Sequence, residues 1–275
     1  MIATDVTYIR VDSPEEAVLA WKAHPGARYL AGGTEITTTA RRSAAYPLTA
    51  LIDVKGLVDT QILENQAGRL ILGAALPLSA LDDWPGFPLL SATVKGVADH
   101  TVRNRLTLGG NIAGMLPYRE AVLPLLLADA AGLSIVPGVG SVAPSRKVWR
   151  LRDRFDKRLT LEPGELLLNF SLPEDCTSLP WAHRRKTRIG PVDYPLVTLC
   201  LVRHGQAFRL AVSGVHPYPL RADELDVALS AGAVSSRVDA VLEALGTPRS
   251  DQRASADYRA ALFRLMLGSA LEELS

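Results

Sequence analysis

The first third of the chain alternates short apolar runs with apolar positions at helical spacing. Residues 13–16 read Ser-Pro-Glu-Glu, so Ser13 can cap a helix whose first position is occupied by proline and whose third by glutamate. The apolar stripe that follows predicts a helix that ends near residues 24–26. A short apolar run at 28–31 then predicts a strand that stops at Gly32 and Gly33.

The alternation of strands and helices continues through the next eighty residues. Apolar runs predict strands at 48–54 and 69–75, and the second closes a hairpin whose turn lies at 64–68. Residues 89–102 predict a helix. Residues 103–112, which contain a second glycine pair, predict a loop.

The rest of the chain completes the expected architecture. Helices are expected at 120–129, with Leu123, Leu126 and Leu127 inward, and at 234–274 with a break at 246–248, and strands at 133–136, 165–172, 196–203 and 208–215. A long Arg-rich connection joins the first two of these strands, and the last two pair as an antiparallel hairpin. The polar stretch 173–178 contains proline and predicts the boundary between two domains. The sequence therefore predicts an α+β protein in two domains.

Composition narrows the classes of function. The 275 residues are 48% hydrophobic and 21% charged, which is typical of a globular protein. Thirty Lys and Arg against 29 Asp and Glu leave a net charge of +1, which argues against a nucleic-acid-binding protein. The N-terminus shows no export signal, and the most apolar stretch, 121–136, is interrupted by Pro124, Asp129 and Gly132. We expect no membrane span.

The cysteines and histidines exclude several kinds of metal site. Cys176 and Cys200 are the two cysteines of the chain, too few for an iron–sulfur cluster or a cysteine-rich zinc site. They predict a reduced, cytoplasmic protein more simply than a disulfide. The five histidines show no metal-binding spacing, so no metal site is expected. Seven basic residues lie between Arg146 and Arg158, and we interpret them first as a solvated face and second as a subunit contact.

Two glycine pairs carry the strongest chemical signal. The segments are Ala31-Gly32-Gly33-Thr34-Glu35 and Thr107-Leu108-Gly109-Gly110-Asn111. Consecutive glycines let backbone amides approach an anion closely, and each segment adds a hydroxyl. Neither matches a Rossmann fingerprint or a P-loop. Each alone is also typical of a tight turn. Together they suggest a diphosphate-bearing cofactor held between two loops.

These segments resemble the paired FAD signatures of the flavoprotein (medium) subunit of molybdenum hydroxylases, the family of xanthine dehydrogenase and molybdenum-type carbon monoxide dehydrogenase. The resemblance covers nearly the whole chain. It extends to residues 13–17, 51–54, 70–74, 103–104, 163–167, 193–197 and 214–221. Several motifs in the right order make the match specific.

The resemblance implies a fold and a set of binding residues. The fold would be a two-part FAD-binding domain of the p-cresol methylhydroxylase (PCMH) and vanillyl-alcohol oxidase type, residues 1–175 with a break near 55–60. A C-terminal domain of the carbon monoxide dehydrogenase flavoprotein type, residues 176–275, would carry a small antiparallel sheet and helices. The residues implied to contact FAD are Tyr29, Leu30, Ala31, Gly32, Gly33, Thr34, Glu35, Ile36, Val97, Thr107, Leu108, Gly109, Gly110, Asn111, Glu120, Leu167 and Leu168. Which basic residue of 184–188 touches the flavin is left open.

The implied function is electron transfer. The chain would carry FAD in a molybdenum-dependent hydroxylase or dehydrogenase, with a large molybdenum-cofactor subunit and a small iron–sulfur subunit as partners. Electrons would pass from the clusters to NAD, a quinone or dioxygen, and this chain would supply no catalytic side chain. Two alternatives stay open: a stand-alone FAD-dependent oxidoreductase of the same fold, and a scaffold subunit that has lost the cofactor.

Overall fold

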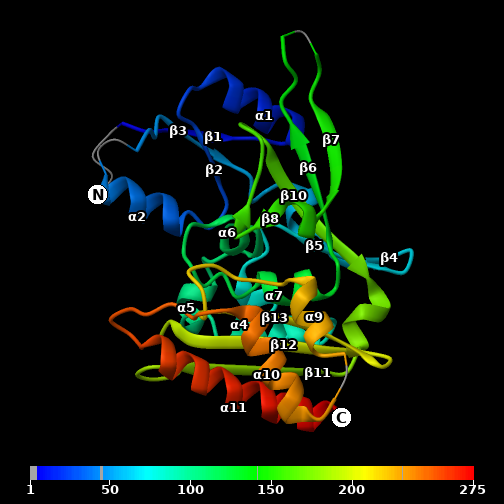
Figure 1. The fold of residues 1–275 in the computed structure, drawn as a ribbon. Helices are drawn as coiled ribbons and strands as arrows, with labels where there is room; N and C mark the ends of the chain where they lie inside the picture. Colours follow the sequence, from blue (N-terminus) through cyan, green and yellow to red (C-terminus); the bar gives the residue numbers. More distant parts are fainter. Residues whose placement is uncertain (1–4, 44–45, 141, 231) are drawn as a thin grey trace.

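Three sheets and a short two-stranded ribbon organise the structure, a computed structural model that describes residues 5–43, 46–140, 142–230 and 232–275 (Figure 1). The strands are β1 (Thr7–Arg10), β2 (Arg28–Leu30), β3 (Ala50–Asp53), β4 (Leu63–Gln66), β5 (Arg69–Gly73), β6 (Ala131–Val136), β7 (Ser145–Arg150), β8 (Phe155–Asp156), β9 (Arg158–Leu159), β10 (Leu166–Pro173), β11 (Trp181–Thr187), β12 (Pro195–His204) and β13 (Ala207–Ser213). The helices are α1 (Pro14–Ala23), α2 (Thr34–Arg42), α3 (Val58–Gln61), α4 (Pro88–Lys95), α5 (His100–Arg103), α6 (Leu108–Ala113), α7 (Val122–Leu127), α8 (Leu151–Arg154), α9 (Asp223–Ala228), α10 (Val234–Leu245) and α11 (Ala256–Leu274), with 3-10 turns η1 (Leu78–Ala80) and η2 (Glu174–Ser178).

The N-terminal sheet is parallel and has the order β1-β3-β2. The predicted start of α1 is confirmed, because the Ser13 hydroxyl accepts from the backbone N–H of Glu16 at 3.1 Å and the Glu16 carboxylate accepts from the N–H of Asp12 at 2.8 Å. The strand predicted at 28–31 is confirmed as β2. Because the strands are parallel, their carboxyl ends, and the glycine pair after β2, lie at one edge of the sheet.

The central sheet is antiparallel and has the order β4-β5-β10-β6-β7. The long Arg-rich connection predicted between the strands β6 and β10 is present, but it contains elements that the sequence did not predict, namely β7, α8 and the β8–β9 ribbon. Trp149 supplies the physical reason for β7, since its ring packs over Gly132 on β6, where a Cβ would lie 2.4 Å from the indole. The β6–β7 hairpin extends past the rest of the molecule (Figure 1).

The long helix predicted at 89–102 is wrong. The structure divides it into α4 and α5, because Gly96 ends α4 and Ala98 takes a positive φ of 54°. Asp99 starts α5 as its cap, accepting from the N–H of Val102 at 2.9 Å. The change of direction lets the basic side chain of Arg103 reach back to the carbonyls of Val97 and Ala98.

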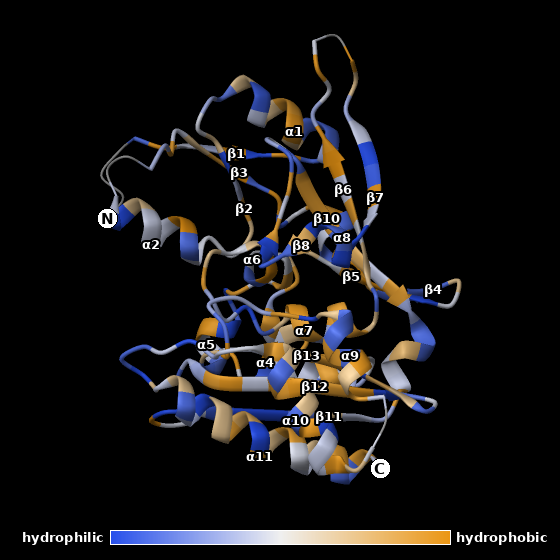
Figure 2. Cartoon of the chain, viewed as in Figure 1, coloured by the Kyte–Doolittle hydropathy of each residue, from blue (hydrophilic) through white to orange (hydrophobic). Residues whose placement is uncertain are grey.

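The third sheet, β11-β12-β13, is antiparallel and lies between two layers of helices (Figure 1). One face of β12, with Cys200 and Val202, shares a hydrophobic core with α4 and α7, and the opposite face, with Leu199 and Leu201, shares a core with α10 and α11. Figure 2 shows β12 mostly in the apolar colour, as burial on both faces requires. The predicted 196–203 and 208–215 hairpin is confirmed as β12 and β13.

The α+β class is confirmed, and a two-part FAD-type region is followed by a small antiparallel sheet with helices. The division of the chain at residue 175 stays a prediction, because α4 and α7 from before it share one core with β12 and β13 from after it. Among the residues that the structure describes, no helix has the length and apolar character to cross a membrane.

Candidate functional site

The first glycine pair connects β2 to α2. Gly33 caps α2 and has a φ of +69°, a left-handed conformation that side chains other than glycine adopt at a cost. Gly32 packs so tightly that a Cβ on it would lie 1.8 Å from the carbonyl oxygen of Arg105. Both glycines are therefore required by the backbone path itself.

The first turn of α2 carries unused hydrogen-bond donors. The first helical bond of the segment runs from the N–H of Thr37 to the carbonyl of Gly33 at 3.0 Å. Within the described ranges, the backbone N–H groups of residues 32–36 donate to no protein acceptor. These groups are partly exposed to solvent and lie at the positive end of the helix dipole. An anion such as a diphosphate is the ligand that this arrangement suits.

The second glycine pair has a different local structure. Residues 108–113 form α6 rather than the predicted loop, because the Thr107 hydroxyl caps the helix by accepting from the N–H of Gly110 at 3.2 Å. The N–H groups of Leu108 and Gly109 donate to the carbonyls of Leu76 and Ala74 at 2.9 and 2.8 Å. Gly109 lies against Ala74, where a Cβ would approach the alanine Cβ to 2.8 Å. This segment offers a close-packed surface, and its amides are already used.

The two glycine segments lie side by side. Gly32 contacts the backbone of Arg105 and is near the Thr107 methyl group. Both carboxylate oxygens of Glu35 accept from the N–H of Met115, at 2.8 and 3.0 Å. The structure therefore brings together the residue sets 31–36 and 107–111 that sequence reasoning placed at one ligand.

Several predicted contact residues line the surroundings of these segments. The Tyr29 hydroxyl donates to the carbonyl of Gly164 at 2.7 Å, and burial raises the pKa of this phenol well above its usual range. Leu167 and Leu168 are adjacent on β10 and face opposite cores, and Leu168 is fully buried beside Ile52. Val97 is partly buried against the core that contains Leu167.

Glu120 lies in a different environment from the other predicted residues. Its carboxylate accepts from Arg185 Nε at 2.9 Å and from the Thr198 hydroxyl at 2.6 Å, and the residue is 3% exposed. Burial raises the pKa of Glu120, while Arg185 and Thr198 lower it. The carboxylate is thus occupied by protein groups, and of the basic residues 184–188 Arg185 is the one that it holds.

Sequence reasoning missed two features near this site. Arg119 is 5% exposed and its Nη1 donates to the carbonyl of Gly114 at 3.3 Å. Tyr118 stacks on Tyr194 with ring centroids 4.8 Å apart, and Arg253 donates to the carbonyl of Tyr194 at 2.8 Å. One signal in the sequence could have indicated the role of Arg119. Arg119 and Glu120 are a basic and an acidic residue next to each other in a stretch that becomes buried.

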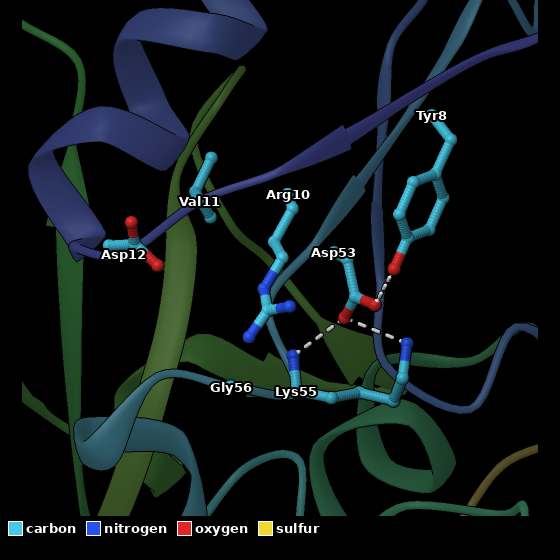
Figure 3. A pocket seen from close by; sticks show the side chains of 7 residues that line it. All are labelled: Tyr8, Arg10, Val11, Asp12, Asp53, Lys55 and Gly56. Atoms are coloured by element: carbon cyan, nitrogen blue, oxygen red, sulfur yellow. Dashed lines mark hydrogen bonds and ion pairs between the residues drawn. The ribbon is translucent and has the colours of Figure 1, made fainter.

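A cavity of about 270 Å³ lies at the carboxyl ends of β1 and β3, the same edge of the sheet as the first glycine pair (Figure 3). Its lining residues are Tyr8, Arg10, Val11, Asp12, Asp53, Lys55 and Gly56. Burial raises the pKa of Asp53, but hydrogen bonds from Lys55 and Tyr8 outweigh it and hold that pKa below its usual range. The Asp53 carboxylate in the centre of the cavity is therefore charged, and Lys55 and Tyr8 stabilise that charge.

A second cavity of about 440 Å³ lies where the end of α4 and the start of α5 face the loop after β11. It is lined by Lys95, Gly96, Ala98, Asp99, His100, Arg103, Arg185, Thr187, Pro191 and Val192. The two arginines are already paired, Arg103 Nε with Asp82 at 2.9 Å and Arg185 with Glu120.

Comparisons with known proteins agree with this geometry. A family described as "FAD binding domain in molybdopterin dehydrogenase" matches residues 4–175. The carbon monoxide dehydrogenase medium chain of Afipia carboxidovorans is 27% identical over 99% of this chain and 97% of its own length. The glyceraldehyde dehydrogenase medium chain of Sulfolobus acidocaldarius is 24% identical over the full length of both. The structure of carbon monoxide dehydrogenase from Hydrogenophaga pseudoflava superimposes with a TM-score of 0.86 at 26% identity, covering 99% of this chain and 98% of that one.

Proposed function

The chain belongs to the family of FAD-binding domains of molybdopterin dehydrogenases, and from this premise we propose that it transfers electrons through FAD within a molybdenum-dependent dehydrogenase complex. It resembles medium chains over nearly its whole length, so it is the FAD-binding subunit of an oxidoreductase. The electron-transfer role and the partner chains are the steps that go beyond this family membership.

The observation that carries the proposal is the set of unused N–H groups at residues 32–36. FAD contains a diphosphate, which needs several converging donors and a close backbone approach. Gly32 and Gly33 provide that approach, since a Cβ at Gly32 has no room and Gly33 has a positive φ. The residues of this chain therefore fit the cofactor of the family.

We assign roles to the predicted residues on this basis. The segment from Tyr29 to Ile36 wraps the diphosphate through its backbone, and Thr107, Gly109, Gly110 and Asn111 form the neighbouring surface. Val97 and Leu167 provide apolar contacts. Leu108 and Leu168 are fully buried, and Glu120 is paired with Arg185, so these three support the walls of the site.

Bound FAD supplies a redox centre that exchanges one or two electrons. This chain binds and orients that centre and needs no nucleophile or acid of its own. Because two cysteines are too few to ligate an iron–sulfur cluster, a small partner chain holds the clusters. A large partner chain holds the molybdenum cofactor. Electrons leave to an external acceptor, which is NAD, a quinone or dioxygen. Residues 1–175 form the FAD-binding domain of this subunit and residues 176–275 its C-terminal domain.

The experiment that tests the proposal begins with purification of the chain from its native host. We expect one larger and one smaller partner chain to copurify with it. We also expect denaturation to release FAD in a one-to-one ratio with this chain. Recovery of the chain alone, with turnover of a small organic substrate, would instead establish the stand-alone oxidoreductase. Assembly with partners but without FAD at any stage would establish the scaffold.

A further inference from the structure

One peptide group, between Gly114 and Met115, is held at both ends by charged side chains. The Glu35 carboxylate accepts from its N–H at 2.8 and 3.0 Å. The Arg119 guanidinium donates to its carbonyl oxygen at 3.3 Å. A negative and a positive group thus bind the positive and negative ends of the same dipole. We refer to Glu35, Arg119 and this peptide group as the peptide clamp.

Arg119 is anchored from several sides. Its residue is 5% exposed, its Nη2 donates to the carbonyl of Lys157, and its guanidinium lies 5.4 Å from the centre of the Phe155 ring. Burial lowers the pKa of Arg119, and the Glu35 carboxylate counters part of this effect, so the two groups interact electrostatically. The clamp therefore connects α2 to the β8–β9 ribbon through the end of α6.

Gly114 is fitted to the clamp. A Cβ on it would lie 2.6 Å from Glu35 Oε2 and 3.0 Å from the carbonyl oxygen of Gly110. The carboxylate therefore reaches the peptide group across a space that only glycine leaves open.

The clamp sets the position of an exposed apolar segment relative to the unused amides. Met115 is 68% exposed and Leu116 is 49% exposed, although both are large apolar side chains. Met115 belongs to the clamped peptide group and Leu116 follows it, and Glu35 lies in the first turn of α2, among the unused N–H groups of residues 32–36. The Glu35 carboxylate accepts from the Met115 N–H, and Arg119 donates to two backbone carbonyls through Nη1 and Nη2, whereas Arg119 Nε has no hydrogen-bond partner among the described residues.

We propose that Glu35 and Arg119 are positioning residues of the FAD site, which fix the segment 114–116 beside the first turn of α2 before FAD binds. This inference rests on the proposed function. It makes the Glu35 side chain a support, while the Glu35 backbone N–H keeps its proposed contact with the diphosphate, and it adds Arg119, which the resemblance did not include.

The experiment compares full-length apoprotein variants Glu35→Ala, Glu35→Gln, Arg119→Ala and Arg119→Lys. Glu64→Gln and Arg150→Lys are matched controls, because both residues are exposed and lie on strands outside the site. FAD affinity is measured by the quenching of flavin fluorescence, and hydrogen exchange reports on the amide of Met115 without FAD. Thermal unfolding shows that each apoprotein is folded.

We expect Glu35→Ala and Arg119→Ala each to weaken FAD binding roughly tenfold, the effect of one lost hydrogen bond to a charged group. Exchange of the Met115 amide should accelerate in both apoproteins. Glu35→Gln keeps an acceptor oxygen, so this variant should lose less FAD affinity than Glu35→Ala. The double alanine variant should bind FAD no more weakly than the worse single variant, because both changes release the same peptide group.

The inference is overturned if Glu35→Ala weakens FAD binding while exchange at Met115 is unchanged, since Glu35 would then contact FAD directly. Additive losses in the double variant overturn it as well. If a variant fails to fold, the conservative Glu35→Gln and Arg119→Lys variants decide between these outcomes. A wild-type apoprotein that binds no FAD overturns the proposed function, and hydrogen exchange at Met115 still tests the clamp.

Discussion

Glu120 and Arg185 form a buried ion pair, with Arg185 Nε 2.9 Å from Glu120 Oε1 and both side chains nearly inaccessible to solvent. The pair joins the segment before α7 to β11, which are 65 residues apart in the chain. Arg185 also donates to the carbonyls of Pro191 and Asp193, and thereby fixes the loop that leads to Tyr194. A single guanidinium thus connects the surroundings of the glycine segments to the C-terminal sheet.

Replacement of Glu120 by alanine is expected to lower the free energy of unfolding by about 3–5 kcal/mol, because Arg185 would remain buried without its partner. Urea denaturation measures the change. Asp83→Ala removes an ion pair with Lys95 that is exposed on both sides, and this control should leave the unfolding midpoint unchanged. Equal midpoints for Glu120→Ala and the wild type would mean that the buried pair contributes nothing to stability.

Gly32→Ala is expected to weaken FAD binding at least about tenfold, since its Cβ would lie 1.8 Å from the Arg105 carbonyl and must push the two glycine segments apart. Gly268→Ala on α11 is the matched control, because no atom lies within 4 Å of the position that its Cβ would take. Flavin fluorescence titration of the two apoproteins measures the difference. Full FAD affinity in Gly32→Ala would show that the contact between the segments is dispensable for binding.

Acid is expected to destabilise the protein through His183. Burial, with help from Arg185 and Arg184, lowers the pKa of this imidazole from 6.5 to about 4. The folded state therefore holds His183 neutral where the unfolded chain binds a proton, so its contribution to stability is complete above pH 6.5 and is lost as the pH falls towards 4. The loss should reach about 2 kcal/mol at pH 5.

Urea denaturation at pH 7 and pH 5 checks this prediction. His183→Phe should remove that part of the pH dependence, whereas His204→Gln, at an exposed position on β12, should retain it. Identical pH dependence in the wild type and in His183→Phe would exclude His183 as its source.

Arg259 is expected to be required for folding of the C-terminal region. It is fully buried, its Nη1 donates to the carbonyls of Leu196 and Gly214 at 2.5 and 2.8 Å, and its Nη2 pairs with Asp251 at 2.8 Å. Arg259→Lys keeps the charge but loses the forked geometry, and we expect a loss of about 3 kcal/mol or more in the free energy of unfolding. Thermal unfolding beside the exposed control Arg150→Lys measures it, and equal midpoints would contradict the expectation.

The elements that sequence reasoning predicted well are those whose cause is local. The start of α1 follows from side chains within four residues of Ser13, and β12 follows from a continuous apolar run. The failures have distant causes. Helix α6 contains two glycines and has low intrinsic helix propensity, but the carbonyls of Ala74 and Leu76 hold its first turn. Strand β7 is rich in arginine and is fixed by Trp149 over Gly132.

The site shows the same division. The glycine pair at 32–33 could be recognised because a positive φ and a close approach both demand glycine at that place. The bonds of Glu35 to Met115, of Arg119 to Lys157 and of Glu120 to Arg185 could not, because only the folded chain brings these residues together. Glu35 and Met115 are separated by 80 positions, and no local pattern records that separation.

The two-sided burial of β12 has a consequence for biosynthesis. Helix α7 ends at Leu127, and β12, whose residues complete its core, starts at Pro195. At typical rates of translation, the roughly seventy intervening residues take on the order of ten seconds to appear. During that time the apolar faces of α4 and α7 have no sheet to cover them. These two helices can therefore complete their core only after the C-terminal strands have emerged, which makes this interval of synthesis the one in which apolar surface is exposed to other chains.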